Sequence, residues 1–215
     1  MKAAIFDFDG TLVDSMYVWE KVDEDFLTKR GIPVTEEYSD KVRSMYFETA
    51  AVFTKNTYSL PDSIEEIMQE WLDMAHYEYA NNVRLKPYAG EYIRKLKERG
   101  VMLGMATSNN PYLLLPCLEN NGLDGVFDCI CYTSEVGMNK SNPDIYLYTA
   151  RKLGAEPDEC TVYEDIIEGL RSASSAGMKT VAVYDPSNEA HLDEIKNVAD
   201  VFINGYHEIA DCLEY

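Results

Sequence analysis

The feature that most constrains the fold is a series of short apolar runs, each ending where polar or acidic residues begin. Such runs are typical of strands buried on both faces of a parallel sheet. Segments with the charge and apolar pattern of helices separate them and predict βαβ units, hence an α/β fold with a Rossmann-like parallel sheet flanked by helices. The expected strands are 3–6, 101–106, 127–131, 160–163, 180–184 and 201–203, and the clearest expected helices are 92–100, 143–153 and 167–176.

Residues 16–82 interrupt this alternation. They contain long charged, amphipathic stretches, such as 18–29 and 63–79, and no convincing buried strand. A chain of 215 residues can hold one large domain or a domain with a smaller insertion. We therefore expect a small all-helical cap domain at 16–82, inserted into an α/β core formed by 1–15 and 83–215.

The charge balance excludes some classes of partner. The chain has 38 acidic and 19 basic residues and no visible basic stripe, so we expect no nucleic-acid partner. No apolar run approaches the length of a membrane span, and the apolar run near Met1 stops at Asp7, too early for a signal peptide. We expect a cytoplasmic protein, without a membrane partner, that is a monomer.

The cysteines give little indication of a shared function. There are five, with no C-x-x-C pair, which argues against a disulfide framework or a zinc site. Cys129 and Cys131 lie in one apolar stretch and are expected on opposite faces of a strand. We expect small core or surface thiols in a reducing compartment.

Candidate chemistry lies where the expected strands end, because ligands of open parallel sheets bind beyond the carboxyl ends of the strands. Asp7 and Asp9 follow the first strand, and Glu164 and Asp165 follow the strand that begins near Cys160. Close carboxylates repel one another unless a cation lies between them or one of them is protonated. Carboxylate and carbonyl oxygens suit Mg²⁺, so we expect Mg²⁺ as the cofactor.

Three further residues complete a site for a phosphoryl group. Gly10 permits a sharp turn and a close approach of backbone to ligand. Thr107 supplies a hydroxyl and Lys140 an ammonium group for phosphoryl oxygens. Taken singly, each motif has an ordinary reading: a surface acidic pair, a helix cap, or a solvated lysine. Their occurrence together at the strand ends favours phosphoryl transfer to a carboxylate nucleophile.

These residues resemble the motifs of the haloacid dehalogenase superfamily, and within it the β-phosphoglucomutase-like phosphatases with a small helical cap. The similarity covers essentially the whole chain. The motifs are DFDGTLVDS at 7–15, ATSN at 106–109, KSNPDIY at 140–146 and YEDIIEG at 163–169, continuing through SAGM at 175–178.

The resemblance implies that Asp7 attacks phosphorus to form an aspartyl-phosphate, and that Asp9 acts as the acid and then the base. It implies that Thr107 and Lys140 hold the phosphoryl group. The phosphate-binding residues that it implies are Phe8, Gly10, Thr107, Ser108, Asn109 and Lys140, and the implied Mg²⁺ ligands are Asp7, the carbonyl of Asp9, Glu164 and Asp165. The substrate would be a small phosphorylated metabolite.

The chain departs from the family pattern in ways that bear on the phosphoryl acceptor. Ser141 replaces the usual proline after the lysine, and Ile166 replaces the usual serine after the acidic pair. Related mutases carry a histidine where this chain has Trp19, and a small apolar residue where it has Thr11. These two differences favour water as acceptor, hence a phosphatase. A phosphosugar mutase and a non-catalytic binding module are the alternatives.

Residues of the cap would select the substrate. The candidates are Trp19, Arg43 and Tyr46, with Lys41, Lys55 and Tyr17 as further possibilities. For each one, an ordinary core or solvated side chain is the competing interpretation. The sequence does not identify the substrate.

Overall fold

The structure is a computed structural model, which describes residues 1–43 and 45–210. It divides into two compact units, one formed by Met1–Met16 with Val83–Tyr215 and the other by Tyr17–Asn82. The boundary that we expected before residue 16 therefore differs by one residue from the boundary between the units.

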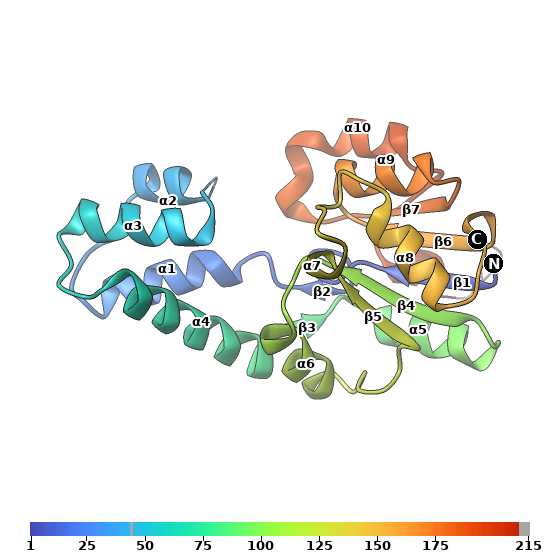
Figure 1. Ribbon diagram of the computed structural model, residues 1–215, viewed down its shortest axis with the longest axis horizontal. Coiled ribbons are helices and arrows are strands. Elements are labelled where there is room, and N and C mark those ends of the chain that lie inside the picture. Colours follow the sequence, from blue (N-terminus) through green and yellow to red (C-terminus); the bar gives the residue numbers. More distant parts are fainter. Residues whose placement is uncertain (44, 211–215) are drawn as a thin grey trace. The chain divides into compact units, whose positions relative to one another are not determined.

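The first unit is built on a six-stranded sheet in which all neighbouring strands are parallel (Figure 1). In spatial order the strands are β5 (Cys129–Tyr132), β4 (Met102–Thr107), β1 (Ala3–Phe6), β6 (Cys160–Glu164), β7 (Lys179–Val183) and β8 (Val201–Ile203). The predicted α/β class with a parallel sheet is confirmed, and each strand lies within a few residues of its expected range.

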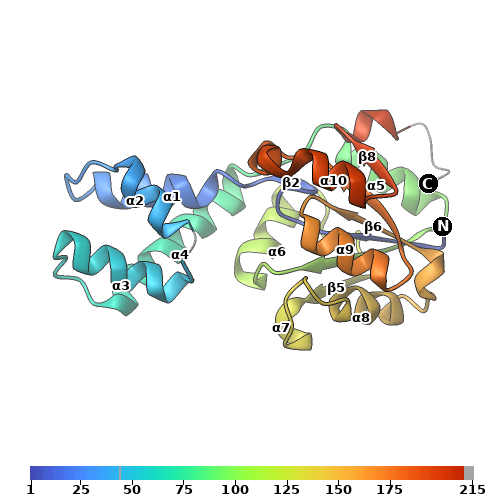
Figure 2. The ribbon, with the colours of Figure 1, turned by 90° about the horizontal axis from the view of Figure 1, so that it is seen from above.

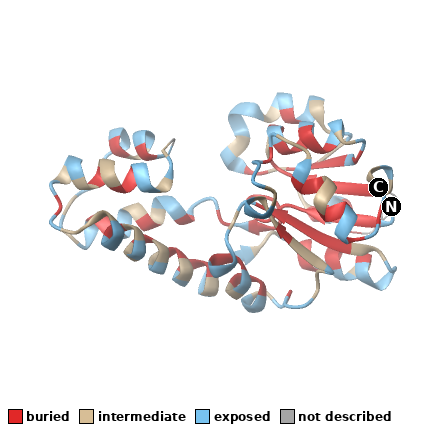
Figure 3. Ribbon diagram, viewed as in Figure 1, coloured by how far each residue is buried: buried red, intermediate tan, exposed pale blue. Residues whose placement is uncertain are grey.

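Helices cover both faces of this sheet, which explains why the central strands are apolar throughout (Figure 3). On one face, Ala3 and Ile5 of β1 pack in a core with α8 (Asp144–Lys152) and α9 (Ile167–Ser175). On the other face, Phe6 stacks on Tyr163 with ring centroids 4.4 Å apart, and Tyr163 contacts Tyr92 of α5 (Ala89–Glu98). The alternation of side chains along β1 thus divides the core into two layers.

The remaining elements of the first unit are short. They are the helices α6 (Pro111–Asn120), α7 (Thr133–Val136) and α10 (Leu192–Val198), and the 3₁₀ turns η1 (Pro157–Glu159), η2 (Pro186–His191) and η3 (Tyr206–Glu208). An antiparallel pair that the sequence did not predict, β2 (Val13–Asp14) with β3 (Arg84–Leu85), joins the two segments that flank the insertion. Two residues per strand are too few to produce a periodic pattern. Among the described residues, no helix has the length and apolar character needed to cross a bilayer.

The expectation for Cys129 and Cys131 was wrong. Both pack against the same core cluster, which includes Ala150 and Leu153 of the α8 region. Alternate residues of a strand share a face, so two cysteines separated by one residue point the same way. The described cysteines are free, and Cys212 lies outside the described residues.

The second unit contains only helices among its described residues (Figure 2). They are α1 (Val18–Thr28), α2 (Glu36–Val42), α3 (Phe47–Tyr58) and α4 (Ile64–Asn81). Edge-to-face contacts join Trp71 to Phe26 and Phe47, with ring centroids 5.6 and 5.7 Å apart. A capping box between Ser63 and Glu66 fixes the start of α4. Aromatic packing between α1, α3 and α4 therefore forms the core of this unit.

One carboxyl group of the helical unit is half-buried and bears on its stability. Burial raises the pKa of Asp23 to about 6, although the hydroxyl of Tyr38, which donates to its Oδ1 at 3.1 Å, opposes the rise. The folded state therefore binds the carboxyl proton of Asp23 more tightly than an unfolded chain does. As a result, the contribution of Asp23 to the free energy of unfolding falls as pH rises from about 4 to about 6.

We expect Asp23→Asn to stabilise the helical unit by roughly 1–3 kcal/mol at pH 7, and the gain to shrink as pH falls toward about 4. Both tryptophans of the chain, Trp19 and Trp71, lie in this unit, so tryptophan fluorescence during urea unfolding reports on it. Glu24→Gln, at an exposed position of α1, is the control. A pH-independent effect of Asp23→Asn would contradict the prediction.

Candidate active site

The chemistry-bearing residues meet at the carboxyl ends of β1, β4 and β6. Phe6 lies in register with Met105 on one side and with Tyr163 on the other, so the three strands end at the same level. The amide of Asp7 donates to the carbonyl of Tyr163 at 2.9 Å, which extends the pairing one residue beyond β1. The parallel register therefore brings Asp7 beside Glu164, as the positions of the expected strands indicated.

Three buried carboxylates form a candidate cation site. Asp7, Glu164 and Asp165 each offer one oxygen, and these oxygens lie within 4.8 Å of one another. Oε1 of Glu164 is buried and has no hydrogen-bond partner among the described residues. Buried carboxylate oxygens of this kind require a cation or a donor, because an unsatisfied charged atom in the interior is costly. The donor set is one that a hard divalent cation prefers.

Lys140 lies against two of these carboxylates. Its ammonium pairs with Asp7 and with Oε2 of Glu164, the latter at 2.9 Å. Burial alone would lower the pKa of Lys140, but the charges of Asp7 and Glu164 outweigh it and hold the pKa above its usual range. The lysine is therefore a permanent cation at the end of the sheet, suited to the negative oxygens of a phosphoryl group.

Glu164 and Asp165 are harder to ionise than ordinary carboxyl groups. Burial, followed by the charge of Asp7, raises the pKa of Glu164 well above its usual range. The same two causes raise the pKa of Asp165 to about 7, against a hydrogen bond from the hydroxyl of Thr11 at 2.8 Å. A bound divalent cation would reverse this effect, since it favours the ionised form of both groups.

The side chain of Asp9 does not join the cluster. The hydroxyl of Ser15 donates to its Oδ1 at 2.6 Å, and the side-chain amide of Asn109 donates to its Oδ2 at 2.8 Å. The amide N–H of Asn109 in turn donates to the buried hydroxyl of Thr107 at 3.0 Å. The two aspartates of the first motif thus have different environments, one beside a lysine and the other held by neutral donors. Ser108, by contrast, is exposed.

The loop between the aspartates depends on Gly10. Its φ of +73° lies in the left-handed region, and a Cβ atom there would be 2.5 Å from Oδ2 of Asp165. The side chain of Phe8 is fully buried, so only its main chain is available to a ligand. The carbonyl of Phe8 accepts from the amides of Leu12 and Val13, which closes the turn.

Two residues of this region were given no role from the sequence. The hydroxyl of Tyr146 on α8 donates to Oε2 of Glu164 at 3.0 Å. Asn188 in η2 donates to Oδ2 of Asp165 at 2.8 Å. The rule that directed attention to strand ends also applies to β7, after which η2 follows at once. The segment that follows β7 includes Asn188, so the same rule would have indicated this residue.

The candidate substrate-binding residues of the helical unit differ in how exposed their side chains are and in which groups they already contact. Trp19 is 40% exposed and its ring packs edge-on to Phe47, whereas Tyr46 is 88% exposed. Arg43 pairs with Glu20 at 2.7 Å. Of the further candidates, Lys41 pairs with Glu37, Lys55 donates to the carbonyls of Leu60 and Asp62, and the hydroxyl of Tyr17 donates to Glu78.

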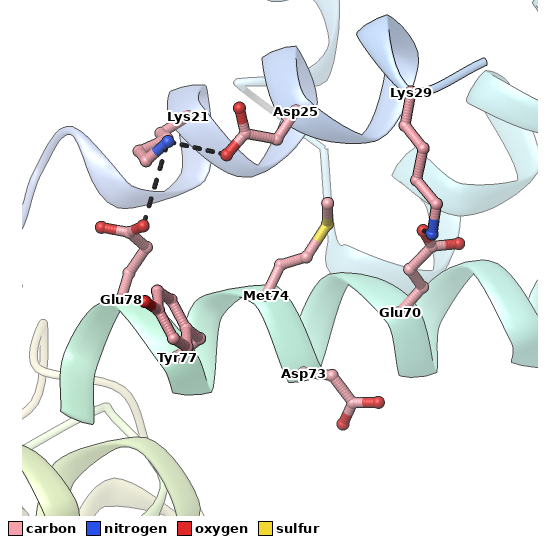
Figure 4. A pocket seen from close by; sticks show the side chains of 8 residues that line it. All are labelled: Lys21, Asp25, Lys29, Glu70, Asp73, Met74, Tyr77 and Glu78. Atoms are coloured by element: carbon pink, nitrogen blue, oxygen red, sulfur yellow. Dashed lines mark hydrogen bonds and ion pairs between the residues drawn. The ribbon is translucent and has the colours of Figure 1, made fainter. Parts of the chain in front are cut away.

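A groove between α1 and α4 in the helical unit is a poor phosphate site (Figure 4). Its lining has four carboxylates and two lysines: Asp25, Glu70, Asp73, Glu78, Lys21 and Lys29. Lys21 contacts Asp25 and Glu78, and Lys29 pairs with Glu70 at 2.7 Å. Both cations are already paired with carboxylates, so the groove offers a phosphate mainly negative charge.

Comparison with known proteins places these observations in a family. Residues 4–183 match the model of a family described as haloacid dehalogenase-like hydrolase. Hexitol phosphatase B of Escherichia coli (strain K12) is 27% identical over 210 residues, which cover 96% of this chain and 93% of that protein. N-acetylmuramic acid 6-phosphate phosphatase of Pseudomonas aeruginosa is 26% identical over 224 residues, covering 100% of this chain and 95% of that protein.

Solved structures share the fold. A crystal structure from Thermotoga maritima aligns with a TM-score of 0.84 at 24% identity, covering 94% of each chain. CbbY from Rhodobacter sphaeroides, in complex with phosphate, aligns with a TM-score of 0.78 at 20% identity, covering 97% of this chain and 96% of its own. β-Phosphoglucomutase from Clostridium difficile aligns with a TM-score of 0.69 at 20% identity, covering 97% and 93%.

We expect Gly10→Ala to weaken the binding of a divalent cation at this candidate site at least about tenfold, because the new methyl group would displace the Asp165 carboxylate (a tenfold change is about 1.4 kcal/mol). Gly122→Ala is the matched control: its φ of +67° imposes similar backbone strain, but nothing lies within 4 Å of the new Cβ. Isothermal titration with Mg²⁺ measures the difference. Equal affinities in the two variants would show that the close approach of Gly10 to Asp165 does not matter.

Proposed function

The chain belongs to the haloacid dehalogenase-like hydrolase family and is a phosphoric monoester hydrolase, and from this premise we propose that it hydrolyses a small phosphomonoester through an aspartyl-phosphate on Asp7, with Mg²⁺ as cofactor. The observation that carries the proposal is the difference between the two aspartates. Asp7 lies in the acidic cluster beside Lys140, whereas Asp9 is held separately by Ser15 and Asn109. One carboxylate can therefore act as nucleophile while the other exchanges protons.

The residues present fit a magnesium ion. Asp7, Glu164 and Asp165 would hold it, and the unpartnered Oε1 of Glu164 is an oxygen available for it. Mg²⁺ prefers oxygen ligands and retains several waters, so three carboxylates would suffice. When bound, the ion would neutralise charge on the phosphoryl oxygens. The backbone carbonyl of Asp9 is a further proposed ligand.

In the first step, an oxygen of Asp7 attacks phosphorus as the ester P–O bond breaks. The leaving alkoxide takes the proton of Asp9 and departs as an alcohol. The ammonium of Lys140 and the hydroxyl of Thr107 would hold the phosphoryl oxygens, with Ser108 and Asn109 nearby on the same loop. A fixed cation and fixed donors lower the barrier, because they need no rearrangement as charge develops.

In the second step, water attacks the phosphorus of the aspartyl-phosphate and Asp9 takes its proton. The bond between phosphorus and Asp7 breaks, which releases inorganic phosphate and restores both carboxyl groups to their starting states. The hydrogen bonds from Ser15 and Asn109 fix the orientation of Asp9 for both proton transfers. Both donors belong to the same unit as Asp7.

The names of two relatives support a substrate class. Hexitol phosphatase B and N-acetylmuramic acid 6-phosphate phosphatase are named for phosphorylated sugar alcohols and sugars. We propose a phosphorylated sugar or a similar small metabolite for this chain. Trp19 and Tyr46, which expose aromatic surface in the helical unit, and Arg43 are the candidates for its recognition.

A phosphosugar mutase is the second candidate, because a structure with the same fold is a β-phosphoglucomutase. In a mutase the acceptor is a sugar hydroxyl rather than water. Thr11, where related mutases carry a small apolar residue, uses its hydroxyl to bond Asp165. Together with Trp19 in place of a histidine, this favours water as acceptor.

A panel of sugar and sugar-alcohol phosphates, assayed with Mg²⁺ for inorganic phosphate, separates these candidates. We expect stoichiometric phosphate release from at least one member and loss of turnover when a chelator is added. Conversion of a sugar 1-phosphate to its 6-phosphate without phosphate release would instead establish the mutase. No reaction with any member, including an aryl phosphate, would refute both.

We expect Asp7→Asn to lower kcat by at least about a thousandfold, because a neutral amide cannot attack phosphorus. Circular dichroism should show that the variant is folded. Asp124→Asn, at an exposed loop position, removes a carboxyl group of the same kind and should leave kcat within about twofold. Retention of wild-type turnover by Asp7→Asn would remove Asp7 as the nucleophile.

A further inference from the structure

Asp165 has a second set of contacts behind the acidic cluster. Its Oδ1 accepts from the hydroxyl of Thr11, and its Oδ2 accepts from the side-chain amide of Asn188, both at 2.8 Å. The same amide also donates to the backbone carbonyl of Asp165 at 3.2 Å. Each carboxylate oxygen has two lone-pair sites, so one neutral hydrogen bond leaves it able to bind a cation. Asn188 therefore fixes the orientation of the carboxylate without occupying it.

Asn188 is held in place by the turn that carries it. Asp185 precedes η2 and accepts from the amide and the hydroxyl of Ser187 at 2.9 and 2.6 Å. The amide N–H of Asn188 donates to the carbonyl of Asp185 at 3.1 Å. Burial alone would raise the pKa of Asp185, but Lys86 and Ser187 hold it below its usual range. The ionised carboxylate is thus the acceptor that organises this turn.

A buried ion pair anchors the turn to another segment of the chain. Nζ of Lys86 lies 2.8 Å from Oδ2 of Asp185, and the two side chains are 12% and 2% exposed. The lysine also donates to the carbonyl of Tyr184 at 2.7 Å, while its own amide donates to the carbonyl of Leu12 at 2.8 Å. Lys86 follows β3, the strand by which the chain re-enters the first unit after the helical insertion.

We infer that Asn188 is a positioning residue for the cation ligand Asp165, and that the Lys86–Asp185 ion pair sets the cation affinity of the site by holding Asn188 in place. This rests on the proposed function, since it presumes that the cluster binds Mg²⁺. A neutral donor is the suitable partner here. A lysine or arginine at position 188 would compete with the cation, whereas an acidic residue would repel Asp165.

The first test removes the amide. Asn188→Ala should raise the Mg²⁺ dissociation constant, measured by isothermal titration without substrate, at least about tenfold, while kcat at saturating Mg²⁺ stays within about threefold of wild type. The matched control is Asn204→Ala. The amide of Asn204 also donates to a carboxylate, Oε1 of Glu208 at 2.8 Å, but on an exposed turn outside the cluster. Its Mg²⁺ constant should not change.

The second test leaves Asn188 intact and weakens its anchor. Asp185→Asn should raise the Mg²⁺ constant about threefold to tenfold, and Asn188→Ala combined with Asp185→Asn should bind no more weakly than Asn188→Ala alone. Such non-additivity is expected only if the ion pair acts through Asn188. Independent, additive losses would overturn the relay even if both single variants fold normally.

The outcomes also separate this inference from the function on which it rests. Wild-type protein that binds Mg²⁺ and an Asn188→Ala variant with an unchanged constant would overturn the positioning role alone. Wild-type protein that binds no Mg²⁺ would overturn both the inference and the proposed cofactor. A loss of kcat that saturating Mg²⁺ does not restore would also overturn the positioning role, because positioning should act on affinity.

Discussion

The contact between Lys140 and the carboxylates of Asp7 and Glu164 is the interaction on which the site depends. Three acidic side chains at the end of a buried sheet repel one another, and desolvation makes each charge more costly. The lysine offsets part of this cost at the two carboxylates that it touches. Asp165, which it does not touch, relies instead on the neutral donors of Thr11 and Asn188.

The need to bring these groups together explains the two glycines of the site. Gly10 allows the first loop to approach Asp165, and Gly169 on α9 leaves room for Glu164 and Tyr146. A Cβ atom on Gly169 would lie 2.6 Å from the carboxyl carbon of Glu164 and from the Tyr146 hydroxyl. Glycine is unfavourable within a helix by about 1 kcal/mol relative to alanine, so its presence in α9 reflects this packing requirement.

Much of the site could be predicted because the chemistry follows the strand ends. The apolar runs located β1, β4 and β6, and the residues after them include Asp7 and Glu164. Asn188 follows β7 by the same logic and was overlooked. Tyr146 is different: its contact with Glu164 depends on how α8 packs on the sheet, which no local pattern specifies. The expectation that Cys129 and Cys131 point to opposite faces was wrong because side chains two residues apart in a strand lie on the same face. The sequence separation alone would have been enough to predict this.

The roles in the helical unit were least predictable. Arg43 has the charge that a phosphorylated ligand requires, yet sequence spacing does not show that Glu20 pairs with it. A side chain on a short helix can meet solvent, a neighbouring helix or a ligand, and only three-dimensional packing distinguishes them. The residues at the strand ends of the first unit were easier to predict. Local apolar runs indicate the buried parallel strands, and the register of those strands then positions the residues that follow them.

The division of the chain into two units also bears on whether water or a sugar hydroxyl accepts the phosphoryl group. The proposed acid, Asp9, is oriented by Ser15 and Asn109, both in the first unit. The candidate cation ligands and Lys140 belong to the same unit. The proposed formation of an aspartyl-phosphate and its proposed attack by water use these groups of the first unit. A mutase needs more, because it must also exclude water and present a sugar hydroxyl to the same phosphorus.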